Sequence, residues 1–570
     1  MLLTDPVKDF FHKIVHQRVL VMVALDVDAL CACKILQSLF RCDNIQYTLV
    51  PVSKKSDLVR EYEEHKEQNK HIILLNCGAN IDLLNTLDPS EDVTFYVIDS
   101  HRPIDLVNFY CERQVYLILK HNQQEIDAIP DYDVIYREYD SDEEESEGDD
   151  DTEQVSKRRR FDEASLMRKK ERREWEERRK EIIFDYEEFS YYGTCASLIV
   201  YDLAWRMSKD NNELLWWAIA GVTDQFQNKR IGRDRYVTGV LELQGHMSRL
   251  NHANEDEDNS KSIDCMRINF EHDLDLALYR HWSLFESLCH SISTVSAFKV
   301  WTNIGMKKLH QFLAEMGIPL TQCKQNYEFM DTKMRDNLQT LVEESALKFG
   351  LKNLKFQSFS AQYGFNHKIC ASDAVYSVNA LLENIKLTDT NGMTDKSNFV
   401  DALEGLSRIS APKMKEGLEL AKLQLQAIRN NVGTFIDVGQ VLSYGPFLYT
   451  SIKEGSPDYK YFSHPTHLNL FSHYLLQSYV RSLGKSKREK AIHLPLVICA
   501  PCDIEEGISI IAGIPPLADD SRKNLFGNAF IHAAERTKSR TSHDYFDSSI
   551  ITMKNEDRSK FIDALITIMT

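Results

Sequence analysis

The sequence predicts an α/β protein with an N-terminal parallel-sheet domain, a helical middle region and a smaller C-terminal α/β domain. Three observations predict this fold. Nearly continuous apolar runs alternate with helical stretches over the first hundred residues, which is typical of a parallel sheet covered on both faces. The region that follows carries mostly amphipathic helical patterns, and strand-like apolar runs return after about residue 430.

The N-terminal elements follow one another in regular order. The apolar runs that we expect to be strands lack the polar alternation of a half-exposed strand. In the stretches between them the apolar residues have helical spacing, and short connections join these stretches to the strands, as βαβ units require. We expect strands at 18–25, 47–52, 71–75 and 94–98, and helices at 29–40, 57–69 and 82–87.

A charged insertion interrupts this pattern. Eleven of the sixteen residues in 138–153 are acidic, and such a run cannot bury enough apolar surface to become ordered. The basic stretch that follows is rich in helix formers over 168–180, so we expect a solvated, charge-laced helix there. Apolar structure resumes afterwards. We therefore expect an insertion over 137–180, partly disordered, within the first domain.

The remaining elements place the domain boundaries. Apolar, amphipathic and strand-like patterns are separated by polar connections that we interpret as linkers. We expect helices at 193–205, 214–221, 274–289, 307–316, 337–349, 524–536 and 559–569, and strands at 433–438, 447–451, 494–500 and 508–514. The domains then span 1–228, 229–375 and 376–570.

Composition excludes several classes of protein. The 570 residues include 86 acidic and 68 basic side chains, a formal charge of −18, which argues against a wholly basic nucleic-acid coat protein. The longest apolar runs, such as 19–25, are too short to cross a bilayer, and no secretory signal is visible. Twelve cysteines are an ordinary number for a reducing compartment. We expect a soluble intracellular protein without a membrane partner.

Polar side chains follow three of the predicted strands where each strand ends. Asp26 and Asp28 follow the first strand, Asn76 the third, and Asp99 and His101 the fourth. In open parallel sheets, ligands bind at the carboxyl ends of the strands where the strand order reverses. Oxygen and nitrogen donors of this kind suit Mn²⁺ or Mg²⁺. Taken one strand at a time, the same residues are more often helix N-caps and turn residues. The three strands together favour a ligand site.

These motifs resemble those of the DHH phosphoesterase superfamily, which includes the RecJ single-strand exonucleases. The likeness lies in Asp-x-Asp after the first strand, the turn after the third, Asp-Ser-His after the fourth, and Thr223-Asp224 as a fourth motif. It implies a catalytic-type α/β domain and a smaller C-terminal domain of the DHHA1 type. A narrower likeness, carried by the charged insertion and the Asp-Arg-Ser-Lys-Phe-Ile-Asp-Ala-Leu ending, is to a eukaryotic family of non-motor subunits of the replicative DNA helicase.

The departures from the RecJ pattern bear on catalysis. Asn76 stands where RecJ-type enzymes carry aspartate, Ser100 replaces the first histidine of the Asp-His-His motif, and Gly513–Pro516 stands in place of a glycine-rich string. Two-metal hydrolysis needs both ions, so we expect no catalytic residue, no cofactor and no bound metal. A single structural metal stays open as an alternative. The remnants of the degenerate metal site are Asp26, Asp28, Asn76, Asp99, His101 and Asp224.

The narrower resemblance implies a non-catalytic scaffold that joins the Mcm hexamer and the GINS complex in the initiation and elongation of DNA replication. Other replisome and origin-loading factors are implied partners, and contact with single-stranded DNA stays open. The sequence encodes no ATPase motor, because Gly484-Lys485-Ser486 lacks the upstream glycine of a phosphate-binding loop. For partner docking, the helical middle offers Trp282, Leu284 and Phe285. The alternative function is an active manganese-dependent RecJ-like exonuclease.

Basic residues at the end of the insertion have the spacing of a bipartite nuclear-import signal. We therefore expect a nuclear protein. Ser141 and Ser146 lie in the acidic context that acidophilic kinases prefer, and phosphate there would add negative charge. The import-signal residues are Lys157, Arg158, Arg159, Arg160, Arg168, Lys169, Lys170, Arg172 and Arg173.

Overall fold

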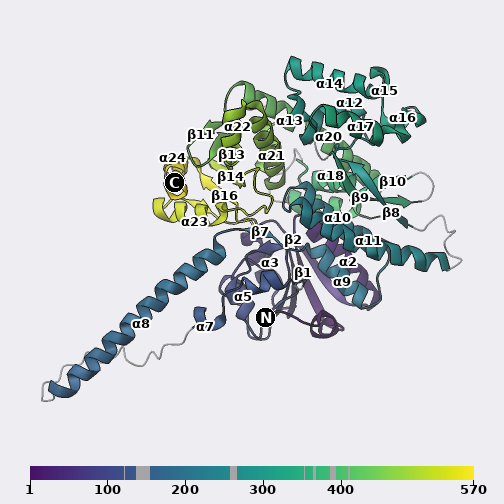
Figure 1. Ribbon diagram of the computed structural model, residues 1–570. Coiled ribbons are helices and arrows are strands. Elements are labelled where there is room, and N and C mark those ends of the chain that lie inside the picture. Colours follow the sequence, from purple (N-terminus) through teal and green to yellow (C-terminus); the bar gives the residue numbers. More distant parts are fainter. Residues whose placement is uncertain are drawn as a thin grey trace. The chain divides into compact units, whose positions relative to one another are not determined.

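The computed structural model divides the chain into two compact units (Figure 1). One unit contains Met1–Leu119 and Ser190–Thr570, and the other is the insertion, Lys120–Phe189. The domain boundaries expected after residues 228 and 375 stay a prediction. The structure describes residues 1–120, 122–136, 155–256, 266–351, 354–363, 367–385, 393–407, 411–456 and 458–570.

The N-terminal sheet is parallel throughout, as predicted, in the order β2-β1-β3-β4-β6. The four predicted strands are confirmed, and a short fifth strand, β6, was not anticipated. Strand order reverses at β1, which pairs with β2 on one side and β3 on the other. The reversal therefore lies where β1 and β3 end. The strands are β1 (Arg18–Ala24), β2 (Gln46–Val52), β3 (His71–Leu75), β4 (Thr94–Ile98) and β6 (Val115–Leu117).

Helices cover both faces of this sheet. The crossovers from β1 to β2 and from β2 to β3 run in opposite directions along the sheet, so right-handed connections place α2 and α3 on opposite faces. Two helices that follow the insertion, α9 and α10, pack with α2. All five predicted helices of this part are confirmed as α2 (Val27–Cys42), α3 (Lys55–His65), α4 (Leu83–Leu87), α9 (Ala196–Arg206) and α10 (Asn212–Gln227).

The middle region is less uniformly helical than the sequence indicated. It contains a three-stranded antiparallel sheet in the order β10-β9-β8. The helix expected at 274–289 is wrong over its first half, because Leu274 ends strand β8 and the helix begins only at Leu284. The other elements are α11 (Arg233–Asp256), β8 (Met266–Leu274), α12 (Leu284–His290), α13 (Ile292–Phe298), α14 (Asn303–Glu315), α17 (Leu338–Lys348), β9 (Lys355–Tyr363), β10 (His367–Cys370) and α18 (Ala371–Leu382).

The C-terminal part is built on a six-stranded mixed sheet, in the order β11-β12-β13-β14-β16-β15. Its core has two layers, one toward α21 and the other toward α23 and α24. The predicted strands and helices are confirmed here with one exception, the strand at 433–438. The elements are α20 (Ala411–Asp437), β11 (Leu442–Ser443), β12 (Leu448–Ser451), α21 (Pro465–Ser482), β13 (Leu496–Asp503), β14 (Ile508–Ile514), α23 (Phe526–Thr537), β15 (Thr541–Ser542), β16 (Ile550–Lys554) and α24 (Arg558–Met569).

The exception has a packing explanation. Residues 433–437 continue the long helix α20 and do not form a strand. A Cβ atom on Gly433 would lie 2.8 Å from Cβ of Trp301. Because glycine has no side chain, α20 can approach the middle region closely at this position. The apolar, β-branched composition of this stretch favours a strand locally, but tertiary packing keeps it helical.

The insertion unit contains the long helix α8 (Val155–Glu187), visible in Figure 1. The predicted charge-laced helix is confirmed within it, and Arg172 pairs with Glu176 at 3.0 Å, one turn further on. Nε1 of Trp175 donates a hydrogen bond to the carbonyl oxygen of Val134 (2.9 Å), which holds the segment before the acidic run against α8.

Two predictions concern residues that the structure does not describe. The acidic run 138–153 lies outside the described residues, and so do the side chains of the first part of the import signal, 157–160 and 168–169. Lys170, Arg172 and Arg173 are described and exposed on α8. Over the described ranges, no helix combines the length and the apolar character that crossing a bilayer requires.

Candidate functional site

The carboxyl ends of β1, β3 and β4 bring the predicted site residues together. Asp26 and Asp28 follow β1, Asn76 follows β3, and Asp99 and His101 follow β4. Asp224 reaches the same place from the last turns of α10. We call these six residues the rim. The rim lies where strand order reverses, which is the position that the parallel topology predicts for a ligand site.

Asp26 is the half-buried member of the rim. It is the N-cap of α2, and its Oδ1 accepts a hydrogen bond from the backbone N–H of Ala29 at 2.8 Å. The same oxygen accepts from Nδ2 of Asn76 at 3.2 Å. Burial raises the pKa of the Asp26 carboxyl above its ordinary value, against the lowering influence of the Arg230 guanidinium.

Asp28 is fully buried and its carboxylate is occupied by donors from three directions. Oδ2 accepts from Nδ2 of Asn76 at 3.0 Å and from the backbone N–H of Ala196 at 2.7 Å, and Oδ1 accepts from the backbone N–H of Ser197 at 2.9 Å. The last two donors are in the first turn of α9. The carboxylate therefore accepts hydrogen bonds from the otherwise unpaired N–H groups at the N-terminus of α9, and its negative charge is stabilised by the positive end of the helix dipole.

One glycine makes this contact possible. A Cβ atom on Gly221 would lie 1.9 Å from Oγ of Ser197 and 2.7 Å from Oδ1 of Asp28. Any larger residue would push α10 away from α9 and α2, because real Cβ atoms do not approach other heavy atoms that closely. The close approach of α10 is also what brings Asp224 to the rim, three residues further along the helix.

Asn76 bridges the two sides of the rim. Its backbone is left-handed (φ +53°), a conformation that asparagine tolerates better than most residues. Its amide nitrogen donates to the carboxylates of Asp26 and Asp28, and its Oδ1 accepts from the backbone N–H (3.0 Å) and the hydroxyl (3.2 Å) of Ser100. A donor group thus lies between the two aspartates, where a metal site would need an electron pair.

Asp99 and His101 form a buried pair. Oδ1 of Asp99 accepts from the backbone N–H of His101 (2.8 Å) and contacts its Nδ1 (2.7 Å), and Oδ2 accepts from the backbone N–H groups of Gly78 and Ala79, both at 2.9 Å. Burial alone would raise the pKa of the Asp99 carboxyl, but His101 and these hydrogen bonds hold it well below its usual range. Burial lowers the pKa of the His101 ring, but the neighbouring Asp99 carboxylate raises it, and this pKa lies above its ordinary value.

Asp224 forms an ion pair with Arg230, which is close to it in the sequence. Its Oδ2 lies 3.1 Å from Nη1 of Arg230, and its Oδ1 accepts from Nδ2 of Asn228 (2.8 Å) and of Asn379 (3.1 Å). Burial raises the pKa of Asp224 to about 7, although Arg230 lowers it. The Arg230 guanidinium also lies over the ring of Tyr192, 5.1 Å from its centre.

A cavity of about 430 Å³ opens beside the rim. Asp26, Asn76, His101 and Arg230 line it on one side. Residues of the C-terminal part also line it, among them Glu383, His464 and Tyr545–Asp547. Its walls mix acidic and basic side chains, so the cavity does not select strongly for a cation or an anion.

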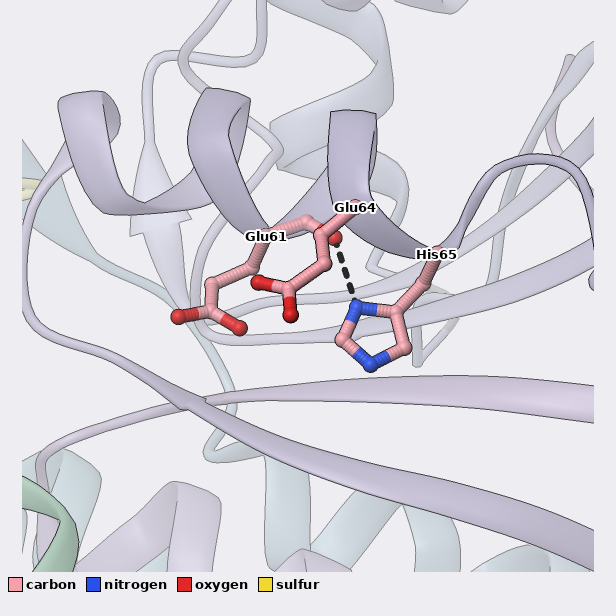
Figure 2. A group of neighbouring side chains, drawn as sticks. All are labelled: Glu61, Glu64 and His65. Carbon is pink, nitrogen blue, oxygen red and sulfur yellow. Dashed lines mark hydrogen bonds between the residues drawn. The ribbon is translucent and has the colours of Figure 1, made fainter.

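The rim does not gather its carboxylates as a metal centre would. Among the described residues, the group of three whose ligand atoms all lie within 4.8 Å of one another is Glu61, Glu64 and His65 on α3 (Figure 2), and it includes none of the rim residues. Glu61 in that group is already paired with Lys396 at 3.1 Å, and Nδ1 of His65 lies 2.9 Å from the carbonyl oxygen of Glu61. The rim carboxylates are thus engaged in hydrogen bonds and ion pairs with the protein itself, and Glu61 and His65 have partners of their own.

The sequence pointed to all six rim residues but missed their partners. Arg230 reaches the rim because the chain turns after α10, where Lys229 is left-handed (φ +59°). Tyr192 and Asn379 come from distant parts of the chain, before α9 and in α18. Gly221 was the one signal that could have been used, since a glycine in the middle of an apolar helix indicates a close approach.

The chain is similar to proteins of known family over its whole length. The sequence model of the CDC45 family matches residues 19–133 and 120–568. A Mus musculus protein named cell division control protein 45 homolog is 50% identical over 575 residues, covering 100% of both chains. The crystal structure of CDC45 from Entamoeba histolytica covers 100% of both chains with a TM-score of 0.70 and 20% identity, which shows the α/β fold alone. A manganese-bound exonuclease RecJ structure aligns over 98% of this chain and 92% of its own at a TM-score of only 0.40 and 11% identity.

Proposed function

The chain belongs to the CDC45 family, and from this premise we propose that it is a non-catalytic subunit of the eukaryotic replicative DNA helicase. It joins the Mcm hexamer and the GINS complex and acts in the initiation and elongation of DNA replication. A subunit of this kind works by binding the active geometry of its partners more tightly than the inactive one. A motor is not required of it.

The observation that carries the non-catalytic assignment is the bridging amide of Asn76. Its donor group lies 3.0 Å from Asp28 and 3.2 Å from Asp26, so these carboxylates are stabilised by hydrogen bonds from the protein itself. Asp224 is neutralised in the same way by Arg230. Two-metal hydrolysis needs two cations at these positions, with water and a leaving oxygen between them. The degenerate metal-site remnants therefore hold the fold together and do not perform hydrolysis.

A nuclease assay and elemental analysis test this assignment. The purified full chain is incubated with a 5′-phosphorylated single strand and Mn²⁺, beside the variants Asp99→Ala and Asp82→Ala. Asp82 is the partly exposed N-cap of α4 and not a rim residue, so it serves as the matched control. We expect no turnover and no stoichiometric manganese in any of the three proteins. Turnover that Asp99→Ala abolishes and Asp82→Ala retains, with both variants folded, would establish the manganese-dependent exonuclease instead.

Partner docking by the middle region is supported by exposed apolar side chains. Leu284, expected to be available, is only 1% exposed and belongs to the core, and Trp282 stacks on His290 with ring centres 4.7 Å apart. Exposure is instead high at Ile304 (71%), Phe329 (73%) and Leu347 (74%). Isolated exposed apolar residues are ordinary, so the test must separate these three from exposed apolar residues elsewhere.

The docking test uses the combined substitution of these three residues by serine. Ile531→Ser on α23, where the side chain is 42% exposed, is the control. In pull-downs with purified Mcm hexamer and GINS, we expect the triple variant to lose binding to at least one partner and the control to retain both. Equal binding by the two variants would remove the middle region as the docking surface.

Nuclear import through the basic end of the insertion completes the proposal. Lys170, Arg172 and Arg173 are exposed on α8, which supports their access to an import receptor. Replacing the basic residues of 157–173 by glutamine and imaging a tagged protein tests it. We expect the variant to stay in the cytoplasm, and a nuclear signal equal to that of the unsubstituted chain would exclude this stretch as the signal.

A further inference from the structure

Three hydroxyl side chains in the sequence have an arginine three residues before them. They are Thr238, Ser283 and Ser539. This spacing matters because basophilic protein kinases bind an arginine at that position with their own carboxylates, and so select the hydroxyl that receives the phosphate. The structure separates the three, because a kinase needs both an accessible hydroxyl and a guanidinium that is not already bound.

Ser283 is excluded by burial. The residue is 3% exposed, and its hydroxyl oxygen caps α12 by accepting a hydrogen bond from the backbone N–H of Glu286 at 3.1 Å. Its arginine, Arg280, donates two hydrogen bonds of 2.8 Å to the carboxylate of Asp273. Neither the hydroxyl nor the guanidinium is therefore available to a kinase in the folded chain.

Thr238 is excluded by its place inside a helix. It lies in the second turn of α11, and its hydroxyl donates to the carbonyl oxygen of Asp234 at 3.0 Å. Its arginine, Arg235, donates to the carbonyl oxygen of Tyr192 at 2.6 Å and lies over the ring of Tyr191, 5.9 Å from its centre. A kinase binds its substrate as an extended segment, so the helix would have to unfold and Arg235 would have to leave both contacts.

Ser539 lies in a turn at the edge of the C-terminal sheet. Helix α23 ends at Thr537, Lys538 is left-handed (φ +49°), and β15 begins at Thr541. Strand β15 has two residues and is the last strand of the sheet, beside β16. A short edge strand is held by few backbone hydrogen bonds and opens at a low cost in free energy, so this turn can be presented as an extended segment.

The Ser539 hydroxyl is suited to act as a phosphate acceptor. Its Oγ lies 2.6 Å from Oγ1 of Thr537. Because Oγ1 of Thr537 donates its own proton to the carbonyl oxygen of Ala533 at 2.7 Å, Ser539 is the donor in the first contact. The lone pairs of Oγ, which attack in phosphoryl transfer, take no part in that bond. Ser539 is partly exposed.

Three cations flank Ser539 in the sequence, and all of them are exposed. Arg536 precedes it by three residues, and Lys538 and Arg540 are its direct neighbours. Arg540 forms ion pairs with Glu556 and Asp557. Over the described ranges, Arg536 and Lys538 form no ion pair. The guanidinium that a kinase would bind is thus free, in contrast to those before the other two hydroxyls.

We propose that Ser539 is a phosphorylation site for a basophilic serine kinase. Oγ of Ser539 forms a bond to the γ-phosphorus of ATP, and the bond from that phosphorus to its bridging oxygen breaks. ADP leaves with that electron pair, and the hydroxyl proton passes to the catalytic base of the kinase. The new group carries a charge of about −1.5 to −2. It therefore offsets much of the positive charge of Arg536, Lys538 and Arg540, and the surface at the end of α23 changes from basic to nearly neutral.

Phosphorylation of the full chain by a purified kinase tests the proposal. The probe is calcium/calmodulin-dependent protein kinase II, which selects an arginine three residues before the acceptor, with Mg²⁺ and ATP, and mass spectrometry identifies the sites. We expect phosphate on Ser539 and none at this position in Ser539→Ala. Arg536→Gln should lower kcat/KM about tenfold or more, the effect of losing one charge-assisted contact. Ser521→Ala, at an exposed serine without that arginine, is the matched control and should leave kcat/KM unchanged.

Ser283 shows whether the kinase acts on the folded chain. It has the same arginine but is buried, so we expect it to receive phosphate only after heat denaturation. Phosphate on Ser283 of the native chain at the level of Ser539 would overturn the proposal, because the sequence pattern alone would then decide. An unmodified Ser539 in the native chain would also overturn it, and so would equal rates for Arg536→Gln and the unsubstituted chain. The readout is phosphate incorporation, so the result is independent of the nuclease and docking tests above.

Discussion

Replacing Asn76 by aspartate is the sharpest test of how the rim is held together. The substitution keeps the acceptor oxygen that bonds to Ser100 at 3.0 Å but turns the donor nitrogen into a second oxygen. That oxygen would lie 3.0 Å from Oδ2 of Asp28 and 3.2 Å from Oδ1 of Asp26. A hydrogen-bond donor between two carboxylates is thereby replaced by a third negative charge.

The expected cost follows from these distances. At about 3 Å, two like charges repel by roughly 5 kcal/mol at an effective dielectric constant of about 20. Protonation of one carboxylate will relieve part of this repulsion. We expect Asn76→Asp to lower the free energy of unfolding by about 3–5 kcal/mol at neutral pH, comparable to breaking a buried charge pair. The melting temperature of the transition that includes the N-terminal sheet should fall by roughly ten degrees.

The same variant should regain stability with a divalent cation. The new carboxylate, together with Asp26, supplies the charged oxygen ligands that Mn²⁺ prefers. Ligands that bind only the folded state stabilise it by mass action. We therefore expect millimolar Mn²⁺ to recover a large part of the lost melting temperature in Asn76→Asp and to leave the unsubstituted chain nearly unchanged.

Differential scanning calorimetry with and without Mn²⁺ measures both effects. Asn430→Asp, on the exposed face of α20, introduces the same chemical change away from any carboxylate pair and is the control. The loss in Asn76→Asp should shrink as the pH falls, because a crowded carboxylate has a raised pKa in the folded state and takes up a proton there first. The bridging role of the amide is refuted if Asn76→Asp has the same melting temperature as Asn430→Asp. It is also refuted if Mn²⁺ stabilises the two variants and the unsubstituted chain equally.

Three further predictions concern the rim and the helix contact at Gly221. Gly221→Ala should cost about 1–3 kcal/mol in thermal melts through overpacking. Adding Ser197→Ala should restore part of this stability, since the new Cβ would meet the Ser197 hydroxyl. A Gly221→Ala variant as stable as the unsubstituted chain would refute the close approach. Burial raises the pKa of Asp224 to about 7, so the unfolded chain loses this proton at a lower pH than the folded chain does. Stability is therefore lost between about pH 4 and pH 7, and Asp224→Asn should gain stability relative to the unsubstituted chain over that range. A constant difference across that range would contradict the shift. Asp28→Ala should cost about 3 kcal/mol or more, because buried N–H groups of α9 lose their acceptor. Asp82→Ala, at a partly exposed cap, should cost about 1 kcal/mol. Similar urea midpoints for the two variants would show that Asp28 is not structurally special.

The sequence predicted the parallel sheet and the rim because both depend on local signals. Buried parallel strands are continuous apolar runs, and strands of one sheet end at a common edge, so polar residues such as Asp26 and Asp99 had to converge. What those residues do at the edge depends on partners that are distant in the chain. Arg230 and Asn379 carry no pattern of their own, and only the folded chain shows that Arg230 forms an ion pair with Asp224 and that Asn379 donates a hydrogen bond to it.

The errors have the same origin. The stretch 433–437 has the composition of a strand, but its packing against Trp301 through Gly433 keeps it in α20. The helix predicted at 274–289 begins only at Leu284, because Leu274 still belongs to strand β8 and the residues between them form turns. The pairing that fixes the end of β8 is with β9, some eighty residues further along the chain, and local spacing does not show it.

The borders of the insertion are fastened on both sides by backbone pairing. Before it, the N–H of Leu117 donates to Met1 and the N–H of Leu3 to Leu117, at 2.9 and 3.0 Å. After it, Ser190 and Asn524 exchange two backbone bonds of 2.8 Å. Because its entry and exit are each anchored, a change of length within the insertion need not disturb the sheet. The insertion is the natural place for a fluorescent domain or an affinity tag.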